Sequence, residues 1–333
     1  MNRQSKKIYS SLMDRIAIAM ILNQGTVLIL GMLFELIKPI FPFVLGEGII
    51  KEIVFGFSEC AIYFVGFVLP MNIFNKMNKN AEKEIYEPYA GLKMPTWVIA
   101  LAVTFTLGAT IVASYINYYA VNIFGDYSKF TADNLWKAEL EHPYQMIIYF
   151  TYIAIIPAVV EEYFFRGTVC RVLTVYGKKT AILVSAVLFA LMHANVEQLL
   201  YSFVAGVLLA WIYVETKNIA IPILVHFLNN GISAVGDILK AIYGQSVYDG
   251  YIAISDAIVI ALALISLIGL LVYFKKKGRI IDKLIIKPDE NGEAVAPLST
   301  KERIVGFFSK GIILFAVYSL VIMIGLIYLS TIS

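Results

Sequence analysis

Charged residues are scarce in this sequence. Only 15% of the 333 residues are charged, whereas 59% are hydrophobic, and the mean hydropathy is +0.77. Soluble globular domains carry about a quarter charged residues, so the composition excludes an ordinary soluble protein. The net charge of +3 is also too small to indicate a nucleic-acid partner. The composition predicts a polytopic membrane protein with the lipid bilayer as its surroundings.

Cysteine and sequence repetition are scarce as well. The two cysteines, Cys60 and Cys170, lie in different apolar segments without CxxC spacing. They therefore support neither a disulfide framework nor a thiolate metal site. No internal repeat is visible, which weighs against a transporter built from duplicated halves. The basic start, Met1 to Arg15, precedes an apolar run without an Ala-x-Ala-like cleavage site, so we expect a first membrane span and not a removed signal peptide.

Apolar runs of about 20 residues recur along the chain. They predict an all-α, polytopic transmembrane helical bundle of about eight to nine spans. The candidate spans are 16–37, 52–72, 96–119, 145–172, 179–194, 197–215, 219–239, 252–274 and 308–330. The motifs described below divide the chain into N-terminal spans over 1–140, a core over 141–245 that carries the motifs, and C-terminal spans over 246–333.

Basic residues are unevenly distributed over the polar connections. Lysine and arginine are frequent in the connections at 73–94 and 276–306 and around Gly177, whereas the connection at 120–143 is acidic. Since cytoplasmic connections carry an excess of lysine and arginine, we expect a multi-pass protein of the cell membrane with a cytoplasmic N-terminus. The short connections and the absence of a targeting segment indicate a bacterial protein.

Two adjacent carboxylates, Glu161 and Glu162, interrupt the apolar segment 145–172. A charged side chain near the bilayer centre costs on the order of 3 kcal/mol, so an intramembrane carboxylate indicates a functional site. Adjacent side chains point in different directions on a helix, and Arg166 lies four residues after Glu162, where it can form an ion pair. We expect Glu161 to face the bundle interior and Glu162 to be held by Arg166.

Two histidines lie in the neighbouring apolar segments. Phe189 precedes His193 by one helical turn and can brace its imidazole. His226 and Asn230 share a face of the next-but-one segment, where Asn229 is a less suitable occupant of the same site.

These groups can converge. Glu161 and His193 lie equally far before and after the turn at Gly177, so antiparallel helices would bring both to a similar depth, about 20 Å along each helix. His226 is somewhat shallower unless its helix tilts. A desolvated glutamate can take a proton from water, and Asn230 can donate to a developing oxyanion. One glutamate with two histidines is also a sound Zn²⁺ set, and the residues alone do not separate metal-dependent from metal-free hydrolysis.

Each residue also has a purely structural interpretation. A buried histidine is more often a hydrogen-bonded structural residue, and Glu161 with Glu162 could be an interfacial pair. Arg166 could be a cytoplasmic anchor, Phe189 fits an ordinary core, and His142 in the outer connection is expected to be solvated. The intramembrane histidines and the adjacent carboxylates nevertheless fall in three of four consecutive spans, which favours a shared site.

At these residues the sequence resembles the CPBP family of CAAX proteases and bacteriocin-processing enzymes, also called Abi, which includes the type II CAAX prenyl endopeptidases. The family pattern is EExxxR, then FxxxH, then HxxxN or HxxxD on successive helices. Here it reads Glu161-Glu162-Tyr163-Phe164-Phe165-Arg166, Phe189-Ala190-Leu191-Met192-His193 and His226-Phe227-Leu228-Asn229-Asn230. The resemblance covers about 145–240, and no motif position departs from the pattern.

The resemblance implies an intramembrane endopeptidase whose cavity opens toward the cytoplasm. Glu161 would activate the attacking water, His193 and His226 would surround that water or a metal, and Asn230 would stabilise the oxyanion. The implied metal ligands are Glu161, His193 and His226. The implied supporting residues are Glu162, Arg166 and Phe189.

The substrate is not fixed by the resemblance. Eukaryotic members cleave prenylated CAAX proteins, whereas bacterial relatives are linked to peptide maturation, bacteriocin self-immunity and signalling. We expect a peptide or a membrane protein as the substrate. A proton-coupled transporter that uses the same buried groups as a relay and a non-catalytic bacteriocin-immunity scaffold are the alternatives.

Overall fold

The computed structural model describes residues 3–46, 48–78, 94–124, 140–277 and 298–332, and within these ranges the chain is helical without a strand. Most of the three polar connections used above to predict orientation lies outside the described residues. The long helices are α1 (Arg3–Ile37), α3 (Ile49–Asn78), α4 (Thr96–Phe124), α8 (Lys178–Met192), α9 (Val196–Thr216), α10 (Ala220–Tyr243), α11 (Gln245–Lys277) and α13 (Lys310–Ile332). The shorter ones include η1 (Lys38–Ile40), α2 (Phe41–Leu45) and α12 (Thr300–Phe307).

The predicted span 145–172 is a continuous but irregular rod. It consists of α5 (Pro143–Phe150), the π-helical segment η4 (Thr151–Ile155), α6 (Ile156–Glu162), the π-helical segment η5 (Tyr163–Cys170), α7 (Arg171–Leu173) and the 3₁₀ turn η6 (Thr174–Tyr176). Gly177 ends it with φ +103°, a backbone conformation that glycine adopts without strain. The predicted turn at Gly177 is therefore present, and α8 returns from it.

Seven of the described helices are long and apolar enough to cross a membrane, or eight if α12 and α13, bent by 55°, form one span. This confirms a polytopic helical bundle. Every predicted span corresponds to a helix, but α8 has only 15 residues and is about 22 Å long, shorter than the hydrocarbon core of roughly 30 Å. The prediction of a full span at 179–194 is wrong because Ala194 turns the backbone to φ +49° and Asn195 caps α9.

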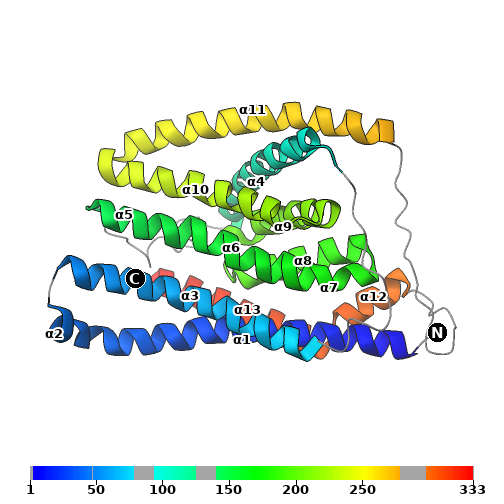
Figure 1. Cartoon of the computed structure of the whole chain (residues 1–333), viewed down its shortest axis with the longest axis horizontal. Coiled ribbons are helices and arrows are strands. Elements are labelled where there is room, and N and C mark those ends of the chain that lie inside the picture. Colours follow the sequence, from blue (N-terminus) through cyan, green and yellow to red (C-terminus); the bar gives the residue numbers. More distant parts are fainter. Residues whose placement is uncertain (1–2, 47, 79–93, 125–139, 278–297, 333) are drawn as a thin grey trace.

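Most of the long helices run roughly along the longest axis of the molecule, and α4 crosses this direction obliquely (Figure 1). In Figure 1, α1, α3 and α13 form the lower layer and α11 the upper edge, and the helices α5 to α10 lie between them. The C-terminal spans separate: α11 packs against α4 and α10, whereas α12 and α13 pack along α1. At the second contact the backbone N–H of Gly311 donates to Asp14 Oδ1 at 2.7 Å.

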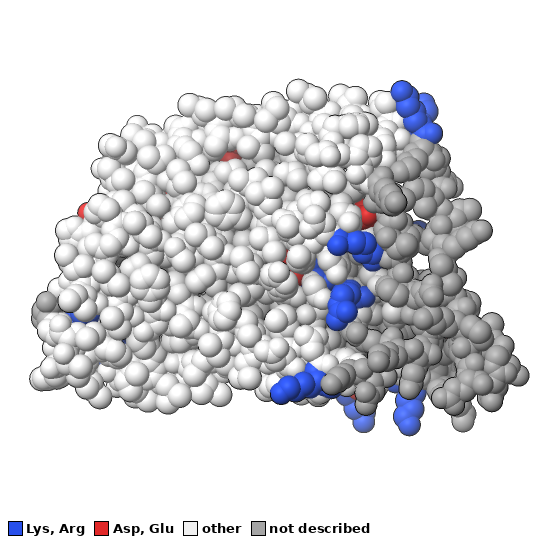
Figure 2. All heavy atoms as spheres, in the orientation of Figure 1, with Lys and Arg blue, Asp and Glu red and all other residues white. Residues whose placement is uncertain are grey.

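Lysine and arginine gather at one end of the molecule on the face shown in Figure 2, over the N-terminal end of α1, the C-terminal end of α11 and α12. The long apolar flanks between the two ends are largely uncharged on that face. This separation is what the excess of basic residues in cytoplasmic connections predicts. It agrees with a cytoplasmic N-terminus, which stays a prediction.

Candidate active site

The carboxylate pair lies at the end of α6, between the two π-helical segments. Such segments are rare in proteins overall. Those that occur often lie at functional sites. Pro157, at the start of α6, has no backbone N–H and cannot donate to the carbonyl of Ile153 one turn earlier. Asn230 Nδ2, from α10, donates to that carbonyl at 3.0 Å. The irregularity of the rod is thus what brings Asn230 against it.

Glu162 is at the centre of a buried ionic network. Its Oε1 accepts from Arg166 Nη1 at 2.8 Å and from His226 Nδ1 at 2.9 Å. Both Glu162 and Arg166 are 0% exposed, so the pair is fully withdrawn from solvent and lipid. The predicted ion pair is present, and the interpretation of Arg166 as a surface anchor is wrong because its guanidinium lies in the bundle core.

Arg166 is also held by two neighbouring helices. Its guanidinium carbon lies 4.4 Å from the centroid of the Phe189 ring on α8, a cation–π arrangement. Its Nη2 donates to the carbonyl of Gly206 on α9 at 3.4 Å. A Cβ on Gly206 would lie only 2.9 Å from Cα of Ala186, so α8 and α9 approach as closely as a glycine allows.

The histidines are oriented by their hydrogen bonds. His226 Nδ1 faces a carboxylate and His193 Nδ1 lies 2.8 Å from the carbonyl oxygen of Phe189. Carboxylate and carbonyl oxygens only accept, so both histidines donate from Nδ1, and in the neutral ring Nε2 then carries the lone pair. The Phe189 ring packs edge-on against His193 at 4.8 Å and against His226 at 6.1 Å. The predicted brace is therefore present and contacts both imidazoles.

Glu161 has a partner that was not predicted from the sequence. Tyr63, from α3, donates its hydroxyl to Glu161 Oε1. Glu161 is 4% exposed, and its Oε2 is buried without a hydrogen-bond partner among the described residues. A tyrosine in an apolar span gives no sequence signal of its own, because aromatic residues are common there. Only the packing of α3 against α6 identifies it.

The first helix also reaches this region. Gln24 Nε2, from α1, donates to the carbonyl of Met192 at 2.9 Å, next to His193. Asn23 Nδ2 donates to the carbonyl of Gly66 on α3 at 2.8 Å. These two polar residues therefore tie α1 to α8 and α3.

The remaining polar candidates lie outside the network. Asn229 Oδ1 accepts from Thr110 on α4 at 2.9 Å, and Asn229 Nδ2 donates to Asn230 Oδ1 at 3.2 Å. Asn229 thus supports Asn230 from behind. His142 is exposed at the start of α5 and stacks on Tyr144, with ring centroids 5.5 Å apart. The expectation that His142 is a solvated residue away from the site is confirmed.

The implied Zn²⁺ set was tested against the geometry. Glu161 Oε2 and the Nε2 atoms of His193 and His226 are suitable donors in kind. However, no three His, Cys, Asp or Glu side chains in the described part of the chain are gathered so that they could hold one ion. His226 is drawn to Glu162, the carboxylate that was expected to pair only with Arg166. The arrangement as it stands does not fit a three-ligand metal centre.

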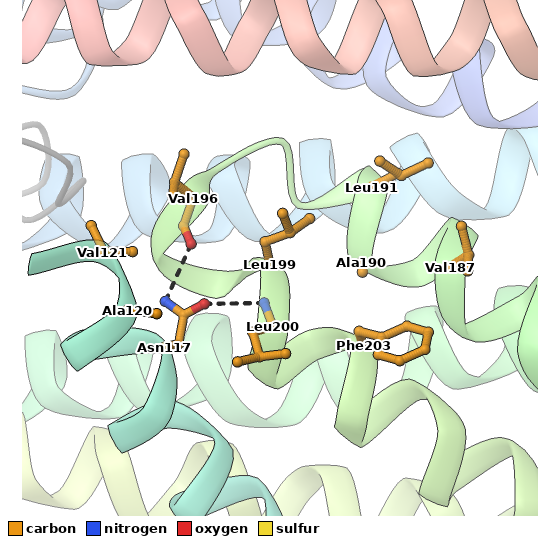
Figure 3. Close-up of a pocket in the computed structure, with 10 residues that line it drawn as sticks. All are labelled: Asn117, Ala120, Val121, Val187, Ala190, Leu191, Val196, Leu199, Leu200 and Phe203. Carbon is orange, nitrogen blue, oxygen red and sulfur yellow. Dashed lines mark hydrogen bonds between the residues drawn. The ribbon is translucent and has the colours of Figure 1, made fainter. Parts of the chain in front are cut away.

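An apolar pocket of about 510 Å³ lies elsewhere, between α4, α8 and α9 (Figure 3). Asn117 is the polar member of its ten lining residues, and its amide is engaged with the first turn of α9, as the dashed lines show. The α8 residues that line the pocket, Val187, Ala190 and Leu191, lie on a different helix face from Phe189 and His193. None of the predicted site residues lines it.

Comparison with known proteins gives a family match and a similar curated protein. Residues 143–232 match the family model described as type II CAAX prenyl endopeptidase Rce1-like. The membrane-embedded CAAX protease MroQ of Staphylococcus aureus (strain USA300) is 32% identical over 100 residues, which is 28% of this chain and 40% of that protein. The aligned part therefore spans well under two thirds of that relative. No solved structure matches the chain. The region matched by the family model holds the carboxylate pair, Arg166 and both intramembrane histidines, so the candidate site lies in the part of the chain that is similar to the CAAX proteases.

Proposed function

We propose that this protein is an intramembrane endopeptidase that hydrolyses a peptide bond with a water molecule activated by Glu161. The observation that carries the proposal is the state of that carboxylate. One oxygen is held by Tyr63, and the other is buried without a partner in the described part of the chain. Burying an unsatisfied carboxylate oxygen is unfavourable, and such an atom is where a water and a substrate can be received.

The neighbouring groups have separate roles in this proposal. Glu162 has a supporting role in this proposal, because its Oε1 accepts from both Arg166 and His226, although its Oε2, like that of Glu161, has no hydrogen-bond partner among the described residues. Glu162 fixes His226 with the lone pair of Nε2 available toward the water. The carbonyl of Phe189 fixes His193 in the same tautomer. A water that donates one O–H to Glu161 Oε2 has a second O–H, and an imidazole Nε2 can accept it and so orient the water for attack.

The reaction can be written with these groups alone. Glu161 Oε2 takes a proton from the water as the water oxygen bonds to the scissile carbonyl carbon. The resulting oxyanion receives a hydrogen bond from Asn230, whose amide has a second N–H besides the one donated to Ile153. Glu161 then returns the proton to the amide nitrogen as the carbon–nitrogen bond breaks. The carboxylate is regenerated, and the products are a carboxylic acid and an amine.

The substrate in this proposal is a membrane-associated protein or a peptide. The carboxylates lie in a rod that spans the bilayer by length and composition, so the cleaved bond must reach the membrane interior or its edge. MroQ is a membrane-embedded CAAX protease of Staphylococcus aureus. For this chain we propose a CAAX-type cleavage, or the processing of a bacteriocin or signal peptide, in a bacterial cell membrane with the N-terminus in the cytoplasm.

The test compares cells that carry the wild-type chain with cells that carry Glu161→Gln at equal abundance. Mass spectrometry of membrane-associated and secreted peptides is the measurement. The matched control is Asp256→Asn, which removes another intramembrane carboxylate, one on α11 that accepts from Tyr115 at 2.7 Å. A processed peptide that disappears with Glu161→Gln and persists with Asp256→Asn is the expected result, and the peptide itself identifies the substrate.

Two other outcomes would replace the proposal. Unchanged peptide profiles, together with a phenotype that depends on a proton gradient, would indicate a transporter that uses the buried groups as a relay. Unchanged profiles with a phenotype that Glu161→Gln leaves intact would indicate a non-catalytic immunity protein that sequesters a peptide.

A further inference from the structure

The catalytic carboxylate is contacted from a helix that lies outside the matched region. Tyr63 belongs to α3, whereas the family match begins at residue 143. The Tyr63 hydroxyl is the described hydrogen-bond donor to Glu161, and it contacts Oε1 and leaves Oε2 without a partner among the described residues. A carboxylate with two equivalent oxygens is thereby made asymmetric, with one oxygen anchored and one available.

We propose that Tyr63 is a positioning residue that fixes the rotation of the Glu161 carboxylate, so that the N-terminal spans form part of the active site. This inference rests on the proposed function of Glu161. A general base must lie within hydrogen-bond reach of the proton that it takes. An unanchored carboxylate rotates about its terminal torsion, which has a broad, roughly two-fold energy profile. The phenol restricts that rotation.

The Tyr63 ring is itself held on two sides. Its centroid lies 5.1 Å from that of Phe67 and 5.8 Å from that of Tyr152, which belongs to the π-helical segment η4. Phe67 in turn packs edge-on against Phe164, at 5.8 Å, two residues after Glu162. The ring therefore bridges α3 and the rod that holds the carboxylates, and such aromatic pairs stabilise one arrangement. A ring that is packed in this way presents its hydroxyl at a fixed place.

The position of α3 is set by α1. Gly66, one turn after Tyr63, lies so close to α1 that an added Cβ would meet Val27 Cγ2 at 2.3 Å. Its carbonyl accepts from Asn23 Nδ2 at 2.8 Å. This contact fixes the separation of α1 and α3 and their register, directly beside the residue that contacts Glu161. The chain of contacts runs from Asn23 through Gly66 and Tyr63 to the base.

Tyr63 could instead contribute only to packing, and the two roles predict different measurements. A packing residue changes the free energy of unfolding. A positioning residue changes kcat with little change in KM, because it acts on the reacting carboxylate and not on the substrate. Tyr63→Phe retains the ring and removes only the hydroxyl. Tyr152→Phe is the matched control, since it removes a hydroxyl from the ring that packs against Tyr63.

The experiment uses the full chain in detergent or proteoliposomes. The probe is a fluorogenic synthetic copy of the peptide that depends on Glu161 in cells. We expect Tyr63→Phe to lower kcat by about 10- to 100-fold, as for a displaced catalytic group, with KM within about twofold and the thermal midpoint unchanged. Tyr152→Phe should retain the wild-type kcat.

Equal kcat values for Tyr63→Phe and Tyr152→Phe would overturn the positioning role while leaving the function of Glu161 intact. A loss of activity that follows a lowered thermal midpoint would overturn it in favour of packing. Full activity of Glu161→Gln would overturn the proposed function, and the role of Tyr63 with it.

Discussion

Replacing Gly206 by alanine tests how closely α8 and α9 must pack for the site to form. The added Cβ would lie 2.9 Å from Cα, 3.1 Å from Cβ and 3.3 Å from the carbonyl oxygen of Ala186. Ordinary contact begins at 3.4 Å, so the two helices would have to separate by roughly 0.5 Å. The atoms on the other side are largely backbone, and no side-chain rotation can relieve the contact.

The magnitude follows from two opposing effects. Overpacking of this kind costs about 1–3 kcal/mol, and alanine gains up to about 1 kcal/mol over glycine in a helix interior. Gly231→Ala separates the two effects, because its Cβ would meet only the Phe150 ring, at 3.7 Å. Both variants gain the helix preference, so their difference isolates the clash. We expect Gly206→Ala to be less stable than Gly231→Ala by about 1–3 kcal/mol.

The chain contains its own reporter for this measurement. Cys60 and Cys170 are both buried thiols, so a thiol-reactive fluorophore labels them as the protein unfolds. Thermal midpoints in detergent should differ between the two variants by roughly 2–10 °C. The separation of α8 and α9 should also lengthen the 3.4 Å hydrogen bond from Arg166 to the Gly206 carbonyl and lower the proteolytic activity. Equal thermal midpoints for the two variants would show that α8 and α9 can accommodate the added methyl group and that their close approach does not contribute to stability.

Three other changes test the rest of the arrangement. Arg166→Met should destabilise the protein by about 3–5 kcal/mol, because it leaves Glu162 charged and buried without its cation. In the thiol assay, the double variant with Glu162→Gln should recover part of that loss. Strictly additive effects of the two substitutions would contradict a direct ion pair. Asn230→Ala should lower the free energy of unfolding by about 1–3 kcal/mol, because it leaves the carbonyl of Ile153 without its donor. The loss should be smaller in a Pro157→Ala background, which restores a backbone N–H to the helix. Equal losses in both backgrounds would show that the missing N–H is irrelevant. Phosphatase fusions should be active at the end of α4 and inactive at the end of α11, and the reverse pattern would place the N-terminus outside.

Local spacing predicted the parts of the site that lie on one helix. The four-residue interval predicts the pair of Glu162 with Arg166, and the same interval predicts the brace of Phe189 on His193. Hydropathy predicted the helical bundle, because each span must satisfy its backbone internally. The order of the three motifs predicted the similarity to CAAX proteases that the family match over residues 143–232 also gives.

Contacts between helices could not be predicted in this way. Convergence of the histidines on the carboxylates was expected, but which carboxylate His226 contacts depends on the rotation of α10. The π-helical segments shift the side chains of the rod, and no residue pattern marks them. Tyr63 is far from Glu161 in sequence and looks like any aromatic residue in a span. The shortness of α8 results from the turn at Ala194. Hydropathy is averaged over a long window of residues and does not detect such a turn.

The packing of α13 on α1 has a consequence for how the protein is made. The first helix enters the membrane long before the last has been synthesised. Until Gly311 arrives, Asp14 lacks the backbone N–H that its carboxylate accepts in the finished bundle, and one side of α1 lacks its neighbour. Because α1 also sets the position of α3, and α3 holds Tyr63 against Glu161, the reactive carboxylate takes its final form late. The active site is therefore fully assembled only after the chain has been synthesised beyond Gly311. Chains that end before this point would be inserted in the membrane without an assembled active site.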